Sequence, residues 1–174
     1  MGLAEDLGYR FPRRTALHRS VQSVGSTRLG AWLFSRCLRR MDDVVGRLTG
    51  GRTSAPELLA GLPVIDVTTV GRRSGRRRKS HLIAVPYAGT LALLGTNFGQ
   101  PSTPSWALNL EADPHVTLRY RGRARDAVAR LVSDEEQAAV LSASAAVYGG
   151  YLAYHRRITG RRLRVFVLEE APAV

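Results

Sequence analysis

The stretch "VIDVTTVGRRSGRRRKSHLIAVPY", residues 64–87, places a cationic loop between two strand-like runs. The flanking runs, "VIDVTTV" (64–70) and "SHLIAVPY" (80–87), are rich in the residue types that favour strands. Six of the eight residues from Arg72 to Lys79 are cationic. The pattern predicts a β-hairpin whose loop carries a dense positive charge.

This loop has the composition of an anion-binding site. Gly71 and Gly75 allow its backbone N–H groups to turn toward one point, and arginine guanidinium groups match phosphate and carboxylate oxygens. A basic turn that only keeps the chain soluble is the simpler alternative. Nucleic-acid binding is a second alternative, but it usually brings aromatic residues that stack on bases, and only Tyr87 lies near the loop.

Further short runs extend the strand pattern toward the C-terminus. A short helix is expected over "SWALNLEA", beginning at Ser105 and ending ahead of "DP". The expected strands are "LALLGT" (91–96), "HVTLRY" (115–120) and "RARDAVARLV" (123–132), the last two joined across "RG" as a hairpin.

The C-terminal third predicts a long helix and a final strand. "SDEE" is a capping box with Ser133 as N-cap, and it begins a helix that runs to about Arg157. Gly149 and Gly150 weaken this helix in its middle. A strand over "LRVFVLE" (163–169) ends the order of elements. The fold class is therefore α+β, with a mainly antiparallel sheet that curls into a barrel.

The N-terminal part reads as a helical extension, residues 1–60, before a domain over 61–174. Between residues 28 and 48, apolar residues recur at helical spacing with arginines between them, and "TGG" follows as a helix stop. This basic amphipathic helix is expected to pack on its own domain, while peripheral contact with an anionic membrane is the alternative.

Length, charge and cysteine content limit the class of protein. A chain of 174 residues with 44% hydrophobic content fits one domain. A net charge of +12 favours anionic partners. Cys37 is the single cysteine, so no internal disulfide forms, and a cytoplasmic location is expected. The first residues lack the apolar region of a secretory signal, and no apolar run is long enough to span a bilayer.

Common catalytic motifs are absent from the sequence. The four histidines are far apart and none has metal-ligand spacing, so no metal site is expected. Neither the phosphate-loop motif nor the dinucleotide-binding glycine motif occurs, and no G-x-S-x-G elbow supports a serine hydrolase. If the protein is an enzyme, a bound cofactor is expected to carry the chemistry.

Three ordered stretches resemble the deazaflavin-dependent nitroreductase family. They are "TTVGRRSGRRRKSHLI", "LLGTNFGQPSTPSWALNLEADP" and "YLAYHRRITGRRLRVFVLE", which together span about residues 64–169. The resemblance implies a split β-barrel that binds coenzyme F420, a deazaflavin with a phosphodiester and an oligoglutamate tail. FMN is the alternative cofactor, but a row of arginines suits a string of anions better than a single phosphate.

The resemblance also assigns cofactor-binding residues by their positions in the motifs. The phosphate-binding turn and its second basic contact correspond to Arg72, Arg73, Ser74 and Arg78. The strand beside the cofactor corresponds to Lys79, Ser80, His81, Leu82 and Ile83. The segment along the ring and ribityl chain corresponds to Leu94, Gly95, Thr96 and Asn97. The helix start that closes the pocket corresponds to Ser105, Trp106, Ala107, Leu108 and Asn109. For Trp106 a core position, and for Asn109 a local backbone cap, are the alternatives.

Tyrosines are the catalytic candidates. Tyr148, Tyr151 and Tyr154 recur every three residues, and the family uses tyrosines of this helix beside the substrate and ring. Tyr151 and Tyr154 are predicted to be catalytic, with Tyr151 also touching the cofactor, whereas simple packing is favoured for Tyr148. Asn97 departs from the family, whose well-known members carry a lysine there that reaches the tail phosphate.

The resulting hypothesis is an F420H2-dependent reductase that transfers a hydride to a quinone, an enone or a nitroaromatic. The proton would come from a tyrosine or from water. One alternative is a non-catalytic carrier of F420 or of a fatty acyl chain, and another is a binder of nucleic acid or lipid headgroups. A small-molecule acceptor is the expected partner, with no specific nucleic acid.

Overall fold

A computed structural model describes residues 2–11, 15–27, 29–30, 32 and 60–171 of the chain. The predicted amphipathic helix over residues 28–48 lies almost entirely outside the described residues. The sequence division at residue 60 stays a prediction, although α1 (Leu3–Leu7) packs directly on the barrel through Leu3 and Leu7. None of the described helices is both long and apolar enough to cross a membrane.

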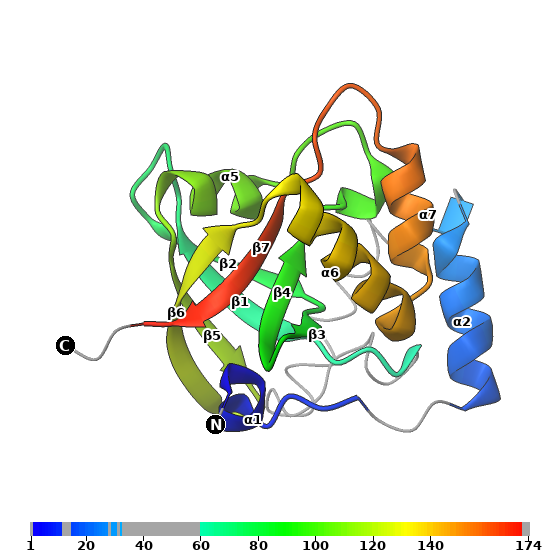
Figure 1. Ribbon diagram of the computed structural model, residues 1–174, viewed down its shortest axis with the longest axis horizontal. Coiled ribbons are helices and arrows are strands. Elements are labelled where there is room, and N and C mark those ends of the chain that lie inside the picture. Colours follow the sequence, from blue (N-terminus) through cyan, green and yellow to red (C-terminus); the bar gives the residue numbers. More distant parts are fainter. Residues whose placement is uncertain (1, 12–14, 28, 31, 33–59, 172–174) are drawn as a thin grey trace.

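The core of the fold is a curled, fully antiparallel seven-stranded sheet with the order β2-β1-β5-β6-β7-β4-β3. Figure 1 shows the sheet with α5 (Ser105–Ala112) over one end of the barrel and α1 at the other. The strands are β1 (Ile65–Val70), β2 (Arg77–Leu82), β3 (Val85–Tyr87), β4 (Thr90–Leu94), β5 (His115–Tyr120), β6 (Arg123–Leu131) and β7 (Val165–Glu170). The α+β class and the barrel-like curl are confirmed.

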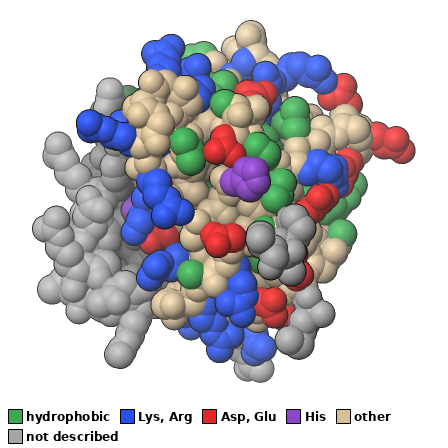
Figure 2. Space-filling view, turned by 90° about the vertical axis from the view of Figure 1, so that its left-hand side faces the viewer, with side chains coloured by type: hydrophobic (Ala, Val, Ile, Leu, Met, Phe, Trp, Pro, Cys, Tyr) green, Lys and Arg blue, Asp and Glu red, His purple; other side chains and the backbone are tan. Residues whose placement is uncertain are grey.

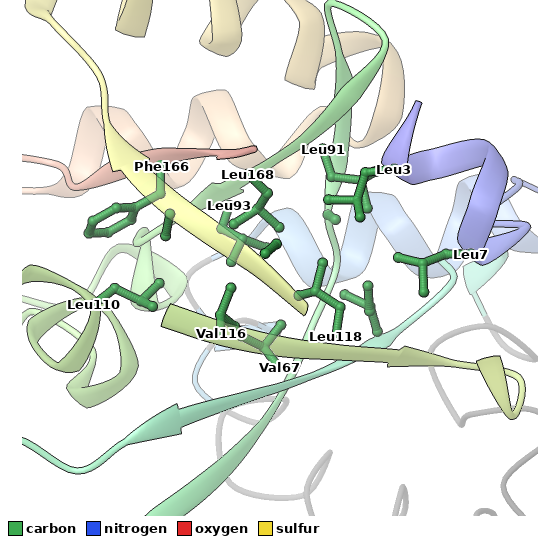
Figure 3. Close-up of a cluster of buried hydrophobic side chains, with 14 of the residues drawn as sticks. Leu3, Leu7, Val67, Leu91, Leu93, Leu110, Val116, Leu118, Phe166 and Leu168 are labelled. Atoms are coloured by element: carbon green, nitrogen blue, oxygen red, sulfur yellow. The ribbon is translucent and has the colours of Figure 1, made fainter. Parts of the chain in front are cut away.

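The barrel interior is filled by alternate residues of the strands. Figure 3 shows side chains of β1, β4, β5 and β7 pointing toward one another, while Leu3 and Leu7 from α1 close one end and Leu110 from α5 the other. On β4, Leu91 and Leu93 face this interior. Because successive strand residues point to opposite faces, alternate residues of β1, β4, β5, β6 and β7 belong to this cluster.

A second hydrophobic cluster lies on the outer side of β3, β4 and β7. There Ala92, Leu94 and Val167 pack against α6 (Asp134–Val147) and α7 (Gly150–Arg157). Burial on both faces explains why β4 and β7 read as continuous apolar runs. The outer faces of β1 and β5 carry no such cover from the described helices, and their residues accordingly alternate between buried and more exposed positions.

Two predicted elements are divided in the structure. The run over 80–87 was expected to be one strand, but Ile83 and Ala84 carry the chain from β2, at one edge of the sheet, to β3, at the other. The predicted helix over 133–157 is broken between α6 and α7. Tyr148 is extended there, with φ −157°, and its ring occupies the space that a Cβ on Gly150 would need.

Other local predictions are confirmed. Ser133 caps α6 by accepting a hydrogen bond from the Glu136 backbone N–H. The β5–β6 hairpin turns at Arg121 and Gly122, whose φ values of 46° and 83° are both positive, as a tight two-residue hairpin turn requires. The remaining described helices are α2 (Ala16–Ser26) and the short 3-10 turn η1 (Asn97–Gly99).

Candidate functional site

The predicted cationic loop is shorter than the sequence suggested, because β2 begins inside it. Pairing with β1, in which Val70 lies opposite Arg77, extends the ladder through the charged residues. The turn itself covers residues 71–76 and is closed by a hydrogen bond from the Gly71 N–H to the Arg76 carbonyl at 2.9 Å. Gly75 adopts a φ of +63°, which explains the need for glycine at this position.

Four arginines around this turn have no partner within the part of the chain that the structure describes. The side chains of Arg72, Arg73, Arg76 and Arg78 are exposed and make no hydrogen bond or ion pair with described residues. We call these four residues the open arginine cluster. Their charge is not neutralised there, and an anionic ligand could neutralise it.

The two faces of β2 have different roles. Arg78, Ser80 and Leu82 lie opposite the buried residues of β1 and so face the barrel side, whereas Lys79 and His81 lie on the outer face. A ligand that lies along one face of β2 meets the side chains of one set only. The predicted cofactor residues of this strand are therefore divided between two faces.

The outer-face side chains, Lys79 and His81, are already paired with an acidic residue. Asp66 on β1 is 2.7 Å from His81 Nδ1 and 3.1 Å from Lys79 Nζ. Burial raises the pKa of Asp66, but the hydrogen bonds from His81 and Lys79 outweigh that effect and lower it. Figure 2 shows one face of the molecule, on which Lys and Arg side chains are spread among acidic side chains and a histidine.

Helix α5 fixes the position of the turn. The amide of Asn109 is buried, with its Oδ1 accepting from the Arg72 N–H at 3.1 Å and its Nδ2 donating to Thr69 Oγ1 at 3.0 Å. Asn109 thus caps local backbone, which was the alternative interpretation for it. Because these groups join α5, β1 and the turn, Asn109 also orients the open arginine cluster.

The other predicted residues of α5 divide into core and surface. Ala107 is fully buried, and Trp106 is 8% exposed with its ring 6.1 Å from that of Phe166. Trp106 therefore packs in the barrel interior. Ser105 is exposed and Leu108 half-buried, so these two remain accessible to a ligand.

The segment from Leu94 to Asn97 lies at the same end of the barrel as α5. Gly95 approaches Pro104, the residue before α5, and donates its N–H to the Arg164 carbonyl at 2.7 Å. Leu94 and Thr96 are buried. Asn97 has a φ of +47° and donates its side-chain amide to Ser102.

Arg161 organises this segment, and no motif in the sequence pointed to it. Its guanidinium donates to the carbonyls of Gly95, Thr96 and Gln100 at 3.1, 2.9 and 3.2 Å. Burial lowers the pKa of Arg161. Three bonds from one planar group hold the loop around two consecutive non-glycine residues in left-handed backbone conformations, a kind of strain that clusters at functional sites.

The three tyrosines form a buried group, in which Tyr151 and Tyr154 belong to α7 and Tyr148 lies just before it. Tyr154 donates to the Gly25 carbonyl at 2.7 Å, so the 2.9 Å contact between Tyr148 and Tyr154 uses the proton of Tyr148. Tyr151 donates to the Ile83 carbonyl at 2.8 Å. Burial raises the pKa of all three hydroxyls. All three are therefore neutral near pH 7, and the protons of the two catalytic candidates are bonded to backbone carbonyls.

The predicted residues thus form two groups joined by β2. The turn and α5 lie together at one end, and the Leu94–Asn97 segment approaches both groups, because Gly95 lies near Pro104 whereas Leu94 shares a hydrophobic cluster with Tyr151 and Tyr154. Tyr151 meets Ile83 just beyond the other end of β2, about 20 Å from Arg77 at roughly 3.3 Å per residue. An elongated ligand along this strand would have its anionic end at the open arginine cluster.

A cleft of about 400 Å³ lies elsewhere and contains none of the predicted residues. Glu111, Leu131, Asp134 and Arg164 are among the residues that line it. Its arginines are paired with acids, Arg164 with Glu111 and Arg162 with Asp134, so it presents less unpaired charge than the turn. No group of three or more potential metal ligands occurs among the described residues.

Comparisons with known proteins give a consistent result. A family model described as F420H(2)-dependent quinone reductase matches residues 38–170. A solved structure described as an F420-H2 dependent reductase (FDR-A) is 30% identical, with a TM-score of 0.55, and the match covers 62% of this chain and 94% of that one. Another, described as a domain-swapped dimer, is 26% identical, with a TM-score of 0.58, covering 73% and 95%.

Proposed function

Because the chain belongs to the F420H(2)-dependent quinone reductase family, we propose that it reduces an electron-poor acceptor, a quinone, an enone or a nitroaromatic, at the expense of reduced coenzyme F420. When bound, reduced F420 supplies the hydride. The protein supplies binding, orientation and exclusion of water. The observation that carries the proposal is the open arginine cluster at the end of β2.

This cluster fits the tail of the cofactor. Four guanidinium groups that have no partner among the described residues are exposed around one short turn, and the cofactor tail presents a phosphate followed by several carboxylates. Each charge-assisted hydrogen bond contributes roughly 1.5–3 kcal/mol. Arg78 is best placed among them, since its side chain runs beside Gly71 on the barrel side of β2.

The tyrosine group has a positioning role in this proposal. Tyr151 holds the Ile83 carbonyl and so fixes the chain where it leaves β2. Tyr151 and Tyr154 become proton donors to a reduced acceptor only if their bonds to backbone carbonyls break. Water is the other source of that proton, and the buried, neutral state of the hydroxyls favours it.

Equilibrium titration with F420 and with FMN, at two salt concentrations, tests the cofactor assignment. We expect F420 to bind at least about tenfold more tightly, and this advantage to shrink at high salt because exposed charges are screened. Equal or tighter binding of FMN would refute it.

Turnover is tested separately by following oxidation of F420H2 in the presence of each acceptor class. Binding of F420 without oxidation by any acceptor would support a non-catalytic carrier of the cofactor instead.

A further inference from the structure

One buried hydrogen-bond donor lacks a partner in the part of the chain that the structure describes. It is Nη1 of Arg157, the last residue of α7, and it is the only buried side-chain atom of this kind among the described residues. Leaving a buried, charged N–H group unpaired costs free energy, and such groups in native proteins often have a functional reason. The unpaired donor therefore marks a position at which the protein can bind an oxygen atom of a ligand.

Neighbouring elements hold this guanidinium group in place. Its Nη2 donates to the Ser26 carbonyl at the end of α2, and its Cζ lies 5.9 Å from the centre of the Tyr154 ring. The side chain also passes close to η1, where a Cβ on Gly99 would lie 3.0 Å from the Arg157 Cβ. Because a guanidinium group is planar and rigid, these contacts also fix the direction of Nη1.

The charge of Arg157 acts on the tyrosine group. Tyr148 and Tyr154 meet at 2.9 Å between their hydroxyl oxygens. Burial is the largest effect on these hydroxyls and raises the pKa of both, but the positive charge of Arg157 favours the anionic form of each and acts in the opposite direction. A ligand oxygen that gains negative charge at this place would be stabilised by the same charge.

Phe98 adds an aromatic surface to the same corner of the fold. The residue is half-buried, and its ring lies 5.8 Å from that of Tyr154 in an edge-on arrangement. Its backbone is left-handed, with a φ of 56°, which is unfavourable for a bulky residue. Strain of this kind clusters at functional sites. A planar, unsaturated molecule with a polar oxygen matches an aromatic ring next to an unpaired donor.

We propose that Arg157 binds the carbonyl oxygen of a quinone or enone acceptor and stabilises the negative charge that this oxygen gains. This inference rests on the proposed function, in which a hydride adds to a conjugated carbon of the acceptor. The electron pair of the acceptor's π system then moves to the carbonyl oxygen, to which Nη1 of Arg157 donates. Water supplies the proton that completes the reduction, so one hydride and one proton enter the product.

Binding of an oxygen anion can be measured on the full chain without F420. Lawsone is a hydroxynaphthoquinone that is an anion at neutral pH, with its charge on the oxygens, and unsubstituted naphthoquinone is its neutral counterpart. In calorimetric titrations, Arg157→Gln should weaken lawsone binding at least about tenfold, because it removes a charged donor, and should weaken naphthoquinone binding less. Arg156→Gln is the matched control. This neighbouring arginine is exposed and donates to the Leu152 carbonyl, so its substitution should leave lawsone binding unchanged.

Turnover of naphthoquinone with F420H2 gives the second measurement. Arg157→Gln should lower kcat/KM at least about tenfold and leave the Kd of F420 within about twofold of the parent, because the open arginine cluster lies at a distance. If Arg157 only joined α7 to α2, the variant would lose stability in urea without separating the two naphthoquinones.

Parent-like lawsone binding by Arg157→Gln would refute the inference, and so would a parent that does not bind lawsone. Lawsone binding that depends on Arg157, in a protein that turns over no acceptor, would refute the proposed function but support the oxygen-binding role of Arg157. If Arg157→Gln fails to fold, Arg157→Lys decides, because it keeps the charge and replaces the planar group. It should bind lawsone at least about threefold more weakly than the parent, and parent-like binding would count against the inference.

Discussion

Arg77 and Arg78 are neighbours on β2 that face opposite sides of the sheet. Substituting each in turn therefore distinguishes a specific contact with the cofactor from the effect of positive charge alone. Arg78 lies opposite Thr69 on the barrel side and belongs to the open arginine cluster, whereas Arg77 lies opposite Val70 and donates to Thr117 on the outer face. We expect Arg78→Ala to weaken F420 binding about 10-fold to 150-fold, which corresponds to one lost charge-assisted contact of roughly 1.5–3 kcal/mol. Arg77→Ala removes the same charge at a similar position along the strand.

Screening keeps the effect of Arg77→Ala small, because the Debye length is about 8 Å at roughly 0.15 M salt. The assay is a titration of each variant with F420 near that ionic strength, following the deazaflavin signal. Both side chains are exposed, so the free energy of unfolding should stay within about 0.5 kcal/mol of the parent for each variant. Equal loss of affinity in the two variants would show that β2 contributes diffuse charge and not a one-sided contact.

Three other predictions concern the residues that hold the site. Asn109→Ala should destabilise the protein by about 1–3 kcal/mol in urea unfolding, because it leaves the buried Thr69 hydroxyl and a turn N–H without their partner. Burial raises the pKa of Asp66, but the interactions with His81 and Lys79 together lower it by more than burial raises it. The folded pKa therefore lies below the unfolded value of about 3.9. The resulting stability is fully present above that unfolded value and is lost as the pH falls through the folded pKa. Asp66→Asn should therefore reduce the fall in Tm between about pH 5 and about pH 3, and a fall as large as that of the parent would contradict this assignment. Tyr151→Phe should cost about 1 kcal/mol of stability through the lost bond to Ile83 and should lower kcat more than it lowers F420 affinity, whereas an unchanged kcat would limit Tyr151 to packing.

Local patterns in the sequence were sufficient to predict most elements. The N-cap at Ser133, the arginine–glycine turn of the β5–β6 hairpin and the short helix from Ser105 all appear as predicted. The second half of the predicted capping box does not form, because the Glu136 carboxylate bonds to Arg130. These features depend on residues a few positions apart, so the sequence alone contains their cause. The cationic turn and the order of the motifs likewise predicted the family.

Contacts between distant residues could be decided only by the tertiary structure. Tyr151 bonds to Ile83, and the Tyr9 hydroxyl lies 2.8 Å from the Pro63 carbonyl and accepts from the Ala84 N–H, so tyrosines from both ends of the chain hold the link between the two edge strands. No local pattern marks Asn109 as the residue that orients the turn. The faces of β2 are fixed by its register with β1, because a shift of one residue would exchange Arg78 and Lys79. A strand's own sequence gives the alternation of its side chains, but only its pairing with β1 decides which set faces the barrel.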